Sequence, residues 1–336
     1  MDATPDQRRT NMVFLLTHPR TASNLVTRIL NLDNQPAFKS DMNGYFFLPS
    51  VSRRLELADR SSEDWTEQER ADMNRCLSNC LRTLVDCVAA AEAEGKSVYV
   101  KEHLMWMLSP EAENLGKRGV PAAGGGQIQN QTVLPDSLLT KCIPTFLIRH
   151  PALVFPSLYR TCVDLEGPEQ ARKNADGSFR MEMTWRWSRN MWEWYNRQVN
   201  DGTHARGASG DDRISGSPWP IILDADDVIL HPSVMKRYCQ IVGLDPDRCQ
   251  FEWESATAEE QQSLHAFERR MKSSLLSSTG LIKEGKTAVG LDIEREAQKW
   301  KDEFGEEEAE KLRSWVEDAM PDYEYLRERR LKPGSG

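Results

Sequence analysis

Short apolar runs separated by longer amphipathic segments form the main pattern along this chain. The first run, residues 12–16, is continuous and uncharged, which is typical of a buried strand. Residues 96–103 contain β-branched and aromatic side chains, and residues 143–149 are apolar enough for a central parallel strand. A shorter run over residues 220–223 predicts a fourth strand.

Helical periodicity follows these runs. Apolar residues spaced three and four apart predict helices over residues 25–32, 64–94, 152–164, 181–200, 233–242, 256–276 and 306–320. Strands that alternate with helices predict an α/β fold, in which helices cover both faces of a central, mostly parallel sheet.

The segments between these elements are polar and rich in turn-forming residues. Residues 165–178 and 201–217 read as loops. Residues 119–135, with four glycines and many amide side chains, are expected to form a flexible loop. Flexible tails are expected at residues 1–11 and 330–336, and the chain as a whole is predicted to form a single domain.

Composition narrows the class of protein. Of the 336 residues, 39% are hydrophobic and 28% are charged, and the formal net charge of −9 argues against broad nucleic-acid binding. No stretch approaches the roughly 20 apolar residues of a membrane span, and the N-terminus lacks an apolar signal segment. A cytoplasmic protein without membrane contact is therefore expected. The seven cysteines and six histidines show no metal-binding spacing, which predicts reduced thiols and no bound metal.

Polar and basic residues follow three of the predicted strands. Residues 18–24 follow the first strand, residues 101–103 end the second, and residues 149–151 end the third. In parallel sheets ligands bind beyond the carboxyl ends of the strands, so these segments are expected to meet in one site. The convergent side chains are Arg20, Lys101, Arg149 and His103. Cations gathered in this way in an acidic protein predict a small polyanionic ligand.

The strand, turn and helix over residues 12–32 supply a second argument for an anion. Such a turn aims backbone N–H groups and the positive end of a helix dipole at one point. Arg20 adds a fixed charge there, and neutral donors are added by Thr21, Ser23 and Asn24. An ordinary strand-to-helix connection that contains a basic residue is the competing interpretation.

Three motifs, in this order, resemble those of the sulfotransferases that use 3′-phosphoadenosine 5′-phosphosulfate (PAPS). Residues 18–25, HPRTASNL, resemble the loop that binds the 5′-phosphosulfate in that family. Residues 101–103, KEH, stand where the cytosolic branch carries K-T-H, and residues 149–160 keep the spacing of the family's 3′-phosphate motif. The resemblance extends over residues 12–325 and implies a P-loop sulfotransferase-like fold.

The resemblance implies which residues bind the donor. The 5′-phosphosulfate would be bound by Arg20, Thr21, Ala22, Ser23 and Asn24. The 3′-phosphate would be held by Arg149 and Ser157. A segment over residues 283–290 would close over the nucleotide with Lys283 and Lys286.

The resemblance also implies the catalytic groups. His103 would act as the general base that takes the proton of an attacking hydroxyl, because a histidine can accept a proton near neutral pH. Lys101 would stabilise the transferring group, and Arg20 would neutralise the departing 5′-phosphate. No metal is implied.

Three positions differ from the family pattern. Ala22 stands where the loop carries a glycine, Asn24 stands where it carries a hydroxyl residue, and Leu25 stands where the cytosolic branch carries a tryptophan that stacks on adenine. Trp192 and Trp194, in a tryptophan-rich predicted helix, could supply that stacking, and core packing is the competing interpretation.

The expected acceptor is a small hydroxylated or phenolic molecule. Its pocket would draw on the apolar and aromatic residues Tyr45, Phe46, Phe47, Trp106 and Met107. Plain core packing explains these residues equally well. Nucleic-acid and membrane partners are not expected, and a homodimer is left open.

Two other functions fit the same scaffold. A small-molecule kinase or nucleotide hydrolase is one, but the first loop lacks the Gly-Lys-Ser/Thr that places Mg²⁺ in such enzymes. A non-catalytic nucleotide-binding protein is the other, and the absence of glycine from residues 18–25 is its motivation.

Overall fold

The computed structural model of the protein describes residues 12–39, 45–57, 60–117, 129–200 and 218–334. At the centre of this part of the chain lies a sheet of five parallel strands in the order β2-β3-β1-β4-β5. They are β1 (Met12–Thr17), β2 (Phe38–Lys39), β3 (Ser97–His103), β4 (Cys142–Ile148) and β5 (Ile221–Asp224). The predicted parallel sheet is confirmed, and β2 is the strand that the sequence pattern did not predict.

Helices make up most of the remaining described chain. The longer ones are α1 (Ser23–Leu30), α2 (Leu48–Glu56), α3 (Glu67–Ala93), α4 (Pro110–Lys117), α6 (Pro151–Glu166), α7 (Pro168–Asp176), α9 (Arg186–Asn200), α11 (Pro232–Val242), α15 (Ile293–Phe304) and α16 (Glu306–Glu328). The shorter ones are α5 (Asp136–Leu139), α8 (Phe179–Glu182), α10 (Ala225–Leu230), α12 (Ala258–Ser263), α13 (Ala266–Met271) and α14 (Ser273–Leu276). Single 3₁₀ turns are η1 (Leu32–Asn34), η3 (Ser62–Asp64), η4 (Leu104–Met107) and η6 (Pro246–Arg248). None of the described helices has the length and apolar character needed to span a membrane.

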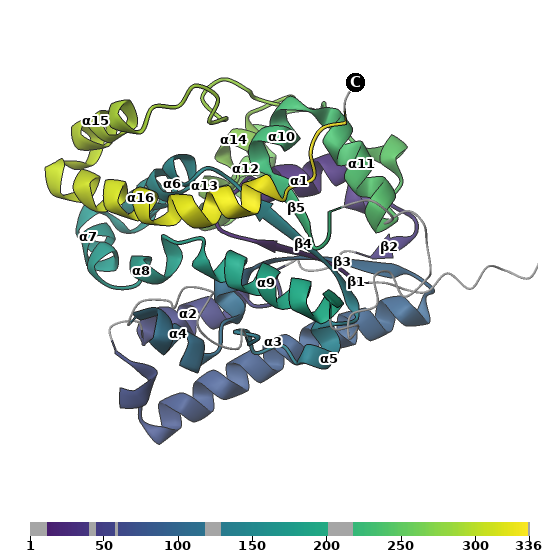
Figure 1. The fold of residues 1–336 in the computed structure, drawn as a ribbon, viewed down its shortest axis with the longest axis horizontal. Helices are drawn as coiled ribbons and strands as arrows, with labels where there is room; N and C mark the ends of the chain where they lie inside the picture. Colours follow the sequence, from purple (N-terminus) through teal and green to yellow (C-terminus); the bar gives the residue numbers. More distant parts are fainter. Residues whose placement is uncertain (1–11, 40–44, 58–59, 118–128, 201–217, 335–336) are drawn as a thin grey trace, which may run out of the picture.

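Helices cover both faces of the sheet, as predicted (Figure 1). Successive side chains of β1 point to opposite faces, because a strand has a period of two residues. Val13 and Leu15 pack in one core with residues of α1 and α11. Phe14 and Leu16 pack in a second, larger core with residues of α3, α6, α9 and α16. The continuous apolar run of β1 is therefore explained by burial on both faces.

Helix α3 is the longest element and matches the predicted boundaries closely. A capping box starts it: Thr66 accepts from the Glu69 backbone N–H, while the Glu69 carboxylate accepts from that of Thr66. Gly95 follows its end with a φ of 66°, a conformation that favours glycine.

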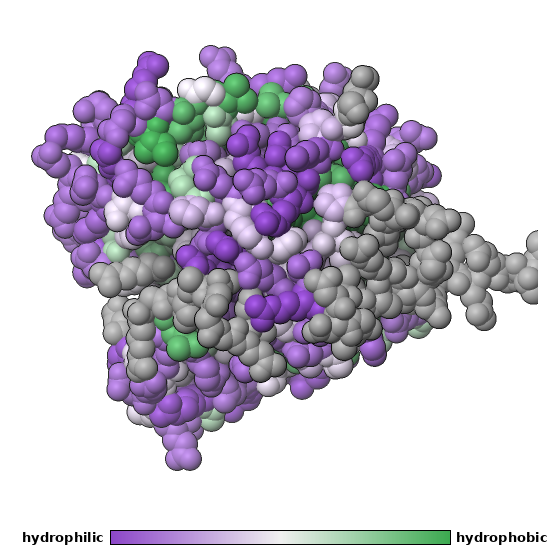
Figure 2. All heavy atoms as spheres, in the orientation of Figure 1, coloured by the Kyte–Doolittle hydropathy of each residue, from purple (hydrophilic) through white to green (hydrophobic). Residues whose placement is uncertain are grey.

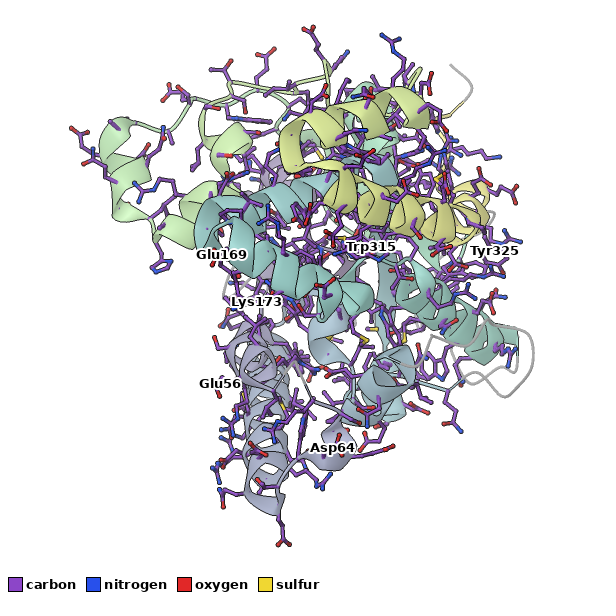
Figure 3. All side chains as sticks on the ribbon, turned by 90° about the vertical axis from the view of Figure 1, so that its left-hand side faces the viewer. Glu56, Asp64, Glu169, Lys173, Trp315 and Tyr325 are labelled. Atoms are coloured by element: carbon purple, nitrogen blue, oxygen red, sulfur yellow. The ribbon has the colours of Figure 1, made fainter. Side chains whose placement is uncertain are left out.

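Figure 3 shows Glu56 and Asp64 in the lower part of the molecule, away from Trp315 and Tyr325 on α16.

The prediction of a polar loop over residues 165–178 is wrong, because α7 occupies most of it. Pro168 starts this helix at its first turn, where the missing N–H costs nothing. The only apolar side chains that α7 buries are Ala171 and Ala175, one turn apart. Such small side chains produce too weak a hydrophobic periodicity to mark a helix in the sequence.

Two predicted helices are broken into pieces by side-chain caps. Over residues 256–276 the chain forms α12, α13 and α14, and the His265 ring accepts the Phe267 backbone N–H at the start of α13. Over residues 181–200 the chain forms the end of α8 and then α9, and Thr184 accepts from the Arg186 backbone N–H. Such side-chain-to-backbone hydrogen bonds compete with those of a continuous helix. The helix is interrupted there, although the spacing of apolar residues in the sequence continues without a break.

The loops and tails are only partly described. Residues 119–128, 201–217 and 1–11 lie outside the described residues. The second part of the expected flexible loop, residues 129–135, is held by main-chain bonds: Ser109 N–H donates to Gln131, and Val133 N–H to Met107.

The start of the C-terminal tail docks against the sheet. Leu331 is fully buried and its N–H donates to the carbonyl of Ile222 at 2.8 Å. Arg330 pairs with Asp227 at 2.6 Å. The expectation of a flexible tail from residue 330 is therefore corrected for these two residues. Leu331 is held by burial of its apolar side chain, and Arg330 is held by its ion pair.

Candidate active site

A cavity of about 340 Å³ opens beyond the carboxyl ends of β1 and β3. The register pairs Thr17 with His103, so the loop after β1 and the end of β3 lie at the same level. The wall also includes the first half of α6 and residues between α11 and α15. Its basic side chains are Arg20, Arg149, Arg160, Lys272 and Lys286, against a single described carboxylate, Glu296. This excess of cations supports the predicted site for a polyanion.

The basic side chains lie close enough to repel one another. Burial and the charges of nearby guanidinium groups, chiefly Arg270 and Arg149, lower the pKa of Arg20 to about 10. Burial and the charges of Arg149 and Arg20 also lower the pKa of Lys286. The positive charge of Arg160 is partly compensated by an ion pair with Glu303. A bound anion would convert this repulsion into attraction.

Arg20 links the two segments that are expected to bind phosphates. Its Nε donates to Oγ of Ser157 at 2.9 Å, and its Nη1 donates to the carbonyl of Met271 at 3.1 Å. Arg149 Nη1 donates to the Arg20 carbonyl at 3.1 Å, and Nη2 donates to the Lys286 carbonyl at 2.7 Å. Arg149 Nε is buried with no protein partner within the described chain. The structure therefore brings these four predicted residues together.

The loop after β1 uses left-handed backbone without glycine. Arg20 and Ala22 both have a φ of 67°. Ala22 precedes α1 and makes no side-chain cap, and no described residue accepts from the N–H groups of Ser23 and Asn24. Those N–H groups at the start of α1 are suited to an anion. Alanine, the smallest side chain after glycine, carries the conformation at a cost of roughly 1–2 kcal/mol.

Two side chains support this loop from below. The buried His18 ring contacts the Pro19 carbonyl through Nδ1 at 2.7 Å and the Glu182 carbonyl through Nε2. Thr21 Oγ1 donates to the His18 carbonyl at 2.7 Å, and the Thr21 side chain is fully buried. Arg20, Ala22, Ser23 and Asn24 line the cavity, whereas Thr21 lies beneath the loop.

Lys101 does not line the cavity itself but contacts two residues that do. Its Nζ donates to Oδ1 of Asn24 at 2.7 Å and lies 4.1 Å from the centre of the Tyr45 ring. Burial, with a smaller contribution from Lys272, lowers the pKa of Lys101 to about 7. An ammonium group at this point would gain from a nearby anion.

The hydrogen bonds of His103 define its tautomer. Thr17 Oγ1 donates its proton to the Glu102 carbonyl at 3.0 Å and lies 2.6 Å from His103 Nδ1. With that proton assigned to the carbonyl, Nδ1 is the donor to Oγ1. Nε2 is then unprotonated and free to accept a proton. Burial, then the charge of Lys101, keeps the pKa of His103 well below 6.5, so the ring is neutral.

Glu102 faces the other side of β3, as strand alternation predicts. Its carboxylate accepts from the backbone N–H groups of Phe47 at 2.8 Å and His103 at 2.9 Å. Burial raises the pKa of Glu102 to about 8, although these two bonds favour the charged form. Glu102 therefore holds the backbone at Phe47 and His103 in place by these two hydrogen bonds.

The segment over residues 283–290 reaches the cavity at one of its two predicted lysines. Lys286 lines the cavity, whereas Lys283 is exposed outside its wall. The segment is tied down by Arg149 and by Asp226, which accepts from the Ala288 N–H at 2.9 Å. Figure 2 shows a strip of hydrophobic residues over the chain between α14 and α15, where Val289 is 74% exposed.

The tryptophans predicted for adenine stacking belong to the core. Trp192 and Trp194 are buried, and Trp192 Nε1 donates to the Pro220 carbonyl at 3.1 Å. The tryptophans that line the cavity are instead Trp253 and Trp300. No sequence motif marks either of them, because they come from segments whose position depends on the packing of the C-terminal half.

The expected acceptor residues divide into two groups. Phe46, Phe47 and Met107 are buried in the larger core. Tyr45 lines the cavity, and its ring lies 4.9 Å from that of His103. The Trp106 ring meets His103 edge-on at 4.5 Å. None of the seven cysteines, all of which lie in the described part of the chain, forms a disulfide.

Comparison with known proteins identifies the class to which this fold and site belong. The chain is 40% identical to a sulfotransferase named ppzF from Metarhizium majus (strain ARSEF 297), over 95% of this chain and 96% of that protein. It is also 40% identical to the ppzF sulfotransferase of Metarhizium rileyi (strain RCEF 4871), over 96% and 97% of the two chains. No protein-family model matches the chain. No solved structure matches it significantly.

The chain therefore belongs to the sulfotransferases. The resemblance seen in the three sequence motifs is confirmed at the level of the family, and the protein is a sulfotransferase enzyme. This result favours sulfuryl transfer over the kinase, the nucleotide hydrolase and the non-catalytic binding protein.

The left-handed conformation of Ala22 leads to a stability prediction. Ala22→Gly should raise the free energy of unfolding by about 0.5–1 kcal/mol, because glycine adopts this conformation without a Cβ penalty. Ala89→Gly, at an exposed position inside α3, is the matched control and should lower it by a similar amount. Urea unfolding measures both variants. A loss of stability in Ala22→Gly as large as in the control would contradict the prediction.

Proposed function

We propose that the protein transfers a sulfuryl group from PAPS to a hydroxyl group of a small acceptor. The excess of basic side chains around one cavity carries this proposal. PAPS bears negative charge at both its 5′-phosphosulfate and its 3′-phosphate, so it would neutralise cations from several segments at once. The sulfotransferase family and the three sequence motifs support the same donor.

Donor binding divides between two neighbouring parts of the cavity. We assign the 5′-phosphosulfate to residues 20–24, where the N–H groups of Ser23 and Asn24 point from the start of α1. We assign the 3′-phosphate to Arg149, Ser157 and Lys286. The bond from Arg20 to Ser157 supports this arrangement, because it shows that the two parts adjoin. Lys283, on the exposed side of its segment, would reach the nucleotide only by a change of side-chain conformation.

Catalysis is assigned to His103, Lys101 and Arg20. His103 Nε2 accepts the proton of the acceptor hydroxyl as the new oxygen–sulfur bond forms and the bond from sulfur to the 5′-phosphate oxygen breaks. Negative charge grows on the departing phosphate, so Arg20 and a protonated Lys101 stabilise the transition state. The neutral state of His103 before reaction, which follows from its burial, is the state that this role requires.

Replacement of His103 tests the assigned base. His103→Ala should lower kcat by about 10²–10⁴-fold, the usual contribution of a general base, and leave the Kd for 3′-phosphoadenosine 5′-phosphate (PAP) nearly unchanged. Transfer of label from PAPS and calorimetry with PAP measure the two quantities. His231→Ala, at an exposed position before α11, is the control and should alter neither. An unchanged kcat in His103→Ala would exclude this base.

Thr17 should act as a positioning residue through the tautomer of His103. Thr17→Val removes the acceptor of the Nδ1 proton, so kcat should fall by about 10–100-fold while the KM for PAPS stays constant. Thr17→Ser should restore activity, because it restores the hydroxyl. Nitrogen NMR of His103 should report an unprotonated Nε2 in the wild type and a mixture in Thr17→Val. A protonated Nε2 in the wild type would refute the tautomer.

Donor binding should be coupled to proton uptake. At pH 8 Lys101 is mostly neutral, because its pKa is about 7, and a neighbouring phosphate would raise that pKa and draw in a proton. Uptake should therefore be present at pH 8 and decline toward pH 6, where Lys101 is already charged. Calorimetry of PAP binding in buffers of different ionisation enthalpy measures it. Lys101→Met should abolish most of the uptake at pH 8, and equal heats in all buffers for the wild type would contradict the prediction.

A further inference from the structure

A second, smaller cavity of about 80 Å³ is lined in part by Trp106, whose ring contacts that of the proposed catalytic base. Its walls come from α2, η4, α4 and α8 with their flanking residues. Most of them are apolar, aromatic or thioether side chains: Val51, Leu55, Leu57, Trp65, Met105, Trp106, Leu108 and Met181. The polar residues on the wall are Arg54, Glu113, Ser178 and Glu182.

The small cavity is one aromatic ring away from His103. Trp106 lines the cavity, and its ring meets the His103 ring edge-on with centroids 4.5 Å apart. Tyr45, which lines the larger cavity, lies 5.2 Å from the same indole. On the opposite wall the Glu182 carbonyl contacts His18, beneath the phosphate loop. A small molecule in this cavity would therefore be close to the assigned base.

One of the two acidic groups on the wall is neutralised by protein. Glu113 forms an ion pair with Arg54. The Arg54 guanidinium also donates to the carbonyls of Trp106 at 3.3 Å and Leu108 at 2.6 Å. Arg54 and Glu113 thus satisfy each other and leave no net charge at their side of the cavity.

The other acidic group, Glu182, has no such partner. Among the residues whose side chains are described, none forms an ion pair or hydrogen bond with its carboxylate. The charge that acts on it is another carboxylate, that of Glu166. Burial, then this like charge, raises the pKa of Glu182 to about 7. Glu182 is half-buried at the wall of the cavity, so a cation or hydrogen-bond donor that entered the cavity could pair with its carboxylate.

The walls around Glu182 suit a cation. Trp65 and Trp106 contribute aromatic rings to the wall, and the face of such a ring attracts an ammonium or guanidinium group; Met105 and Met181 contribute adaptable thioether side chains. We propose that the acceptor carries an amine or guanidine cation, which sits against Glu182 while its hydroxyl extends past Trp106 to His103. This inference rests on the proposed function and names the class of acceptor for the same site.

Matched phenols test the inference. The probes are 4-(ω-aminoalkyl)phenols with two to four methylene groups, each paired with the neutral 4-alkylphenol of the same length. Calorimetry measures the Kd of each probe for the wild-type protein, alone and saturated with PAP, and turnover with PAPS gives kcat/KM. At least one amine should bind the wild type about tenfold or more tightly than its neutral partner.

Two variants separate the carboxylate from general effects on folding. Glu182→Gln keeps the shape of the side chain and should bring amine and neutral phenol within about threefold of each other. It should leave the Kd for PAP and the affinity for the neutral phenols unchanged. Glu166→Gln, at an exposed position outside the cavity, is the control and should keep the preference for the amine.

The outcomes distinguish this inference from the proposed function. A wild type that shows no preference for any amine, or a preference that survives in Glu182→Gln, overturns the inference even when PAP binds. A wild type that does not bind PAP overturns the proposed donor, and the amine preference of the protein alone still decides the role of Glu182. A loss of PAP binding in Glu182→Gln also counts against it, because the effect would then not be confined to the acceptor.

Discussion

Repulsion among cations is the constraint on which the site depends. Arg20, Arg149 and Lys286 are held close together, and burial lowers the pKa of each. The charges of neighbouring cations lower the pKa of Arg20 and Lys286 further, whereas Asp226 and Asp224 oppose the effect at Arg149. This cluster lowers the free energy of unfolding, because like charges held close together oppose folding. The cost is reduced by main-chain carbonyls: those of Arg20, Lys286 and Met271 accept from the two guanidinium groups. The result is a positively charged cavity whose guanidinium groups are held by main-chain hydrogen bonds, which suits an anionic ligand.

Backbone strain and side-chain hydrogen bonds then set the position of the chemistry. The left-handed residues Arg20 and Ala22 turn the loop so that α1 begins with free N–H groups. On the neighbouring strand, the Thr17 hydroxyl links β1 to His103 and orients the imidazole. The loop and the histidine thus share one support, since Thr17 ends β1 immediately before the loop starts. Parallel pairing of β1 with β3 makes this possible, because it aligns the two carboxyl ends.

Much of the fold could be predicted from hydrophobic periodicity, and the misses have physical causes. The strands β1, β3, β4 and β5 could be predicted because each contains a run of buried apolar residues, although β3 and β5 end in buried polar side chains. Helix α7 escaped prediction because it buries little more than alanine. The breaks before α9 and α13 escaped because a single Thr or His side chain redirects the chain without changing its period. Trp192 and Trp194 were linked to the donor by composition alone, and packing places them in the core.

The sequence by itself determined the class of the protein and the segments that build its site. The order and spacing of the motifs at residues 18–25, 101–103 and 149–160 indicate a sulfotransferase. The same order predicts one shared site, because parallel strands bring such segments to one edge of the sheet. Only the tertiary structure decided which side chains meet. Thr17 with His103 and Arg20 with Ser157 are hydrogen-bonded pairs distant in sequence. Their contacts depend on strand register and helix packing, and short-range patterns carry no information about either.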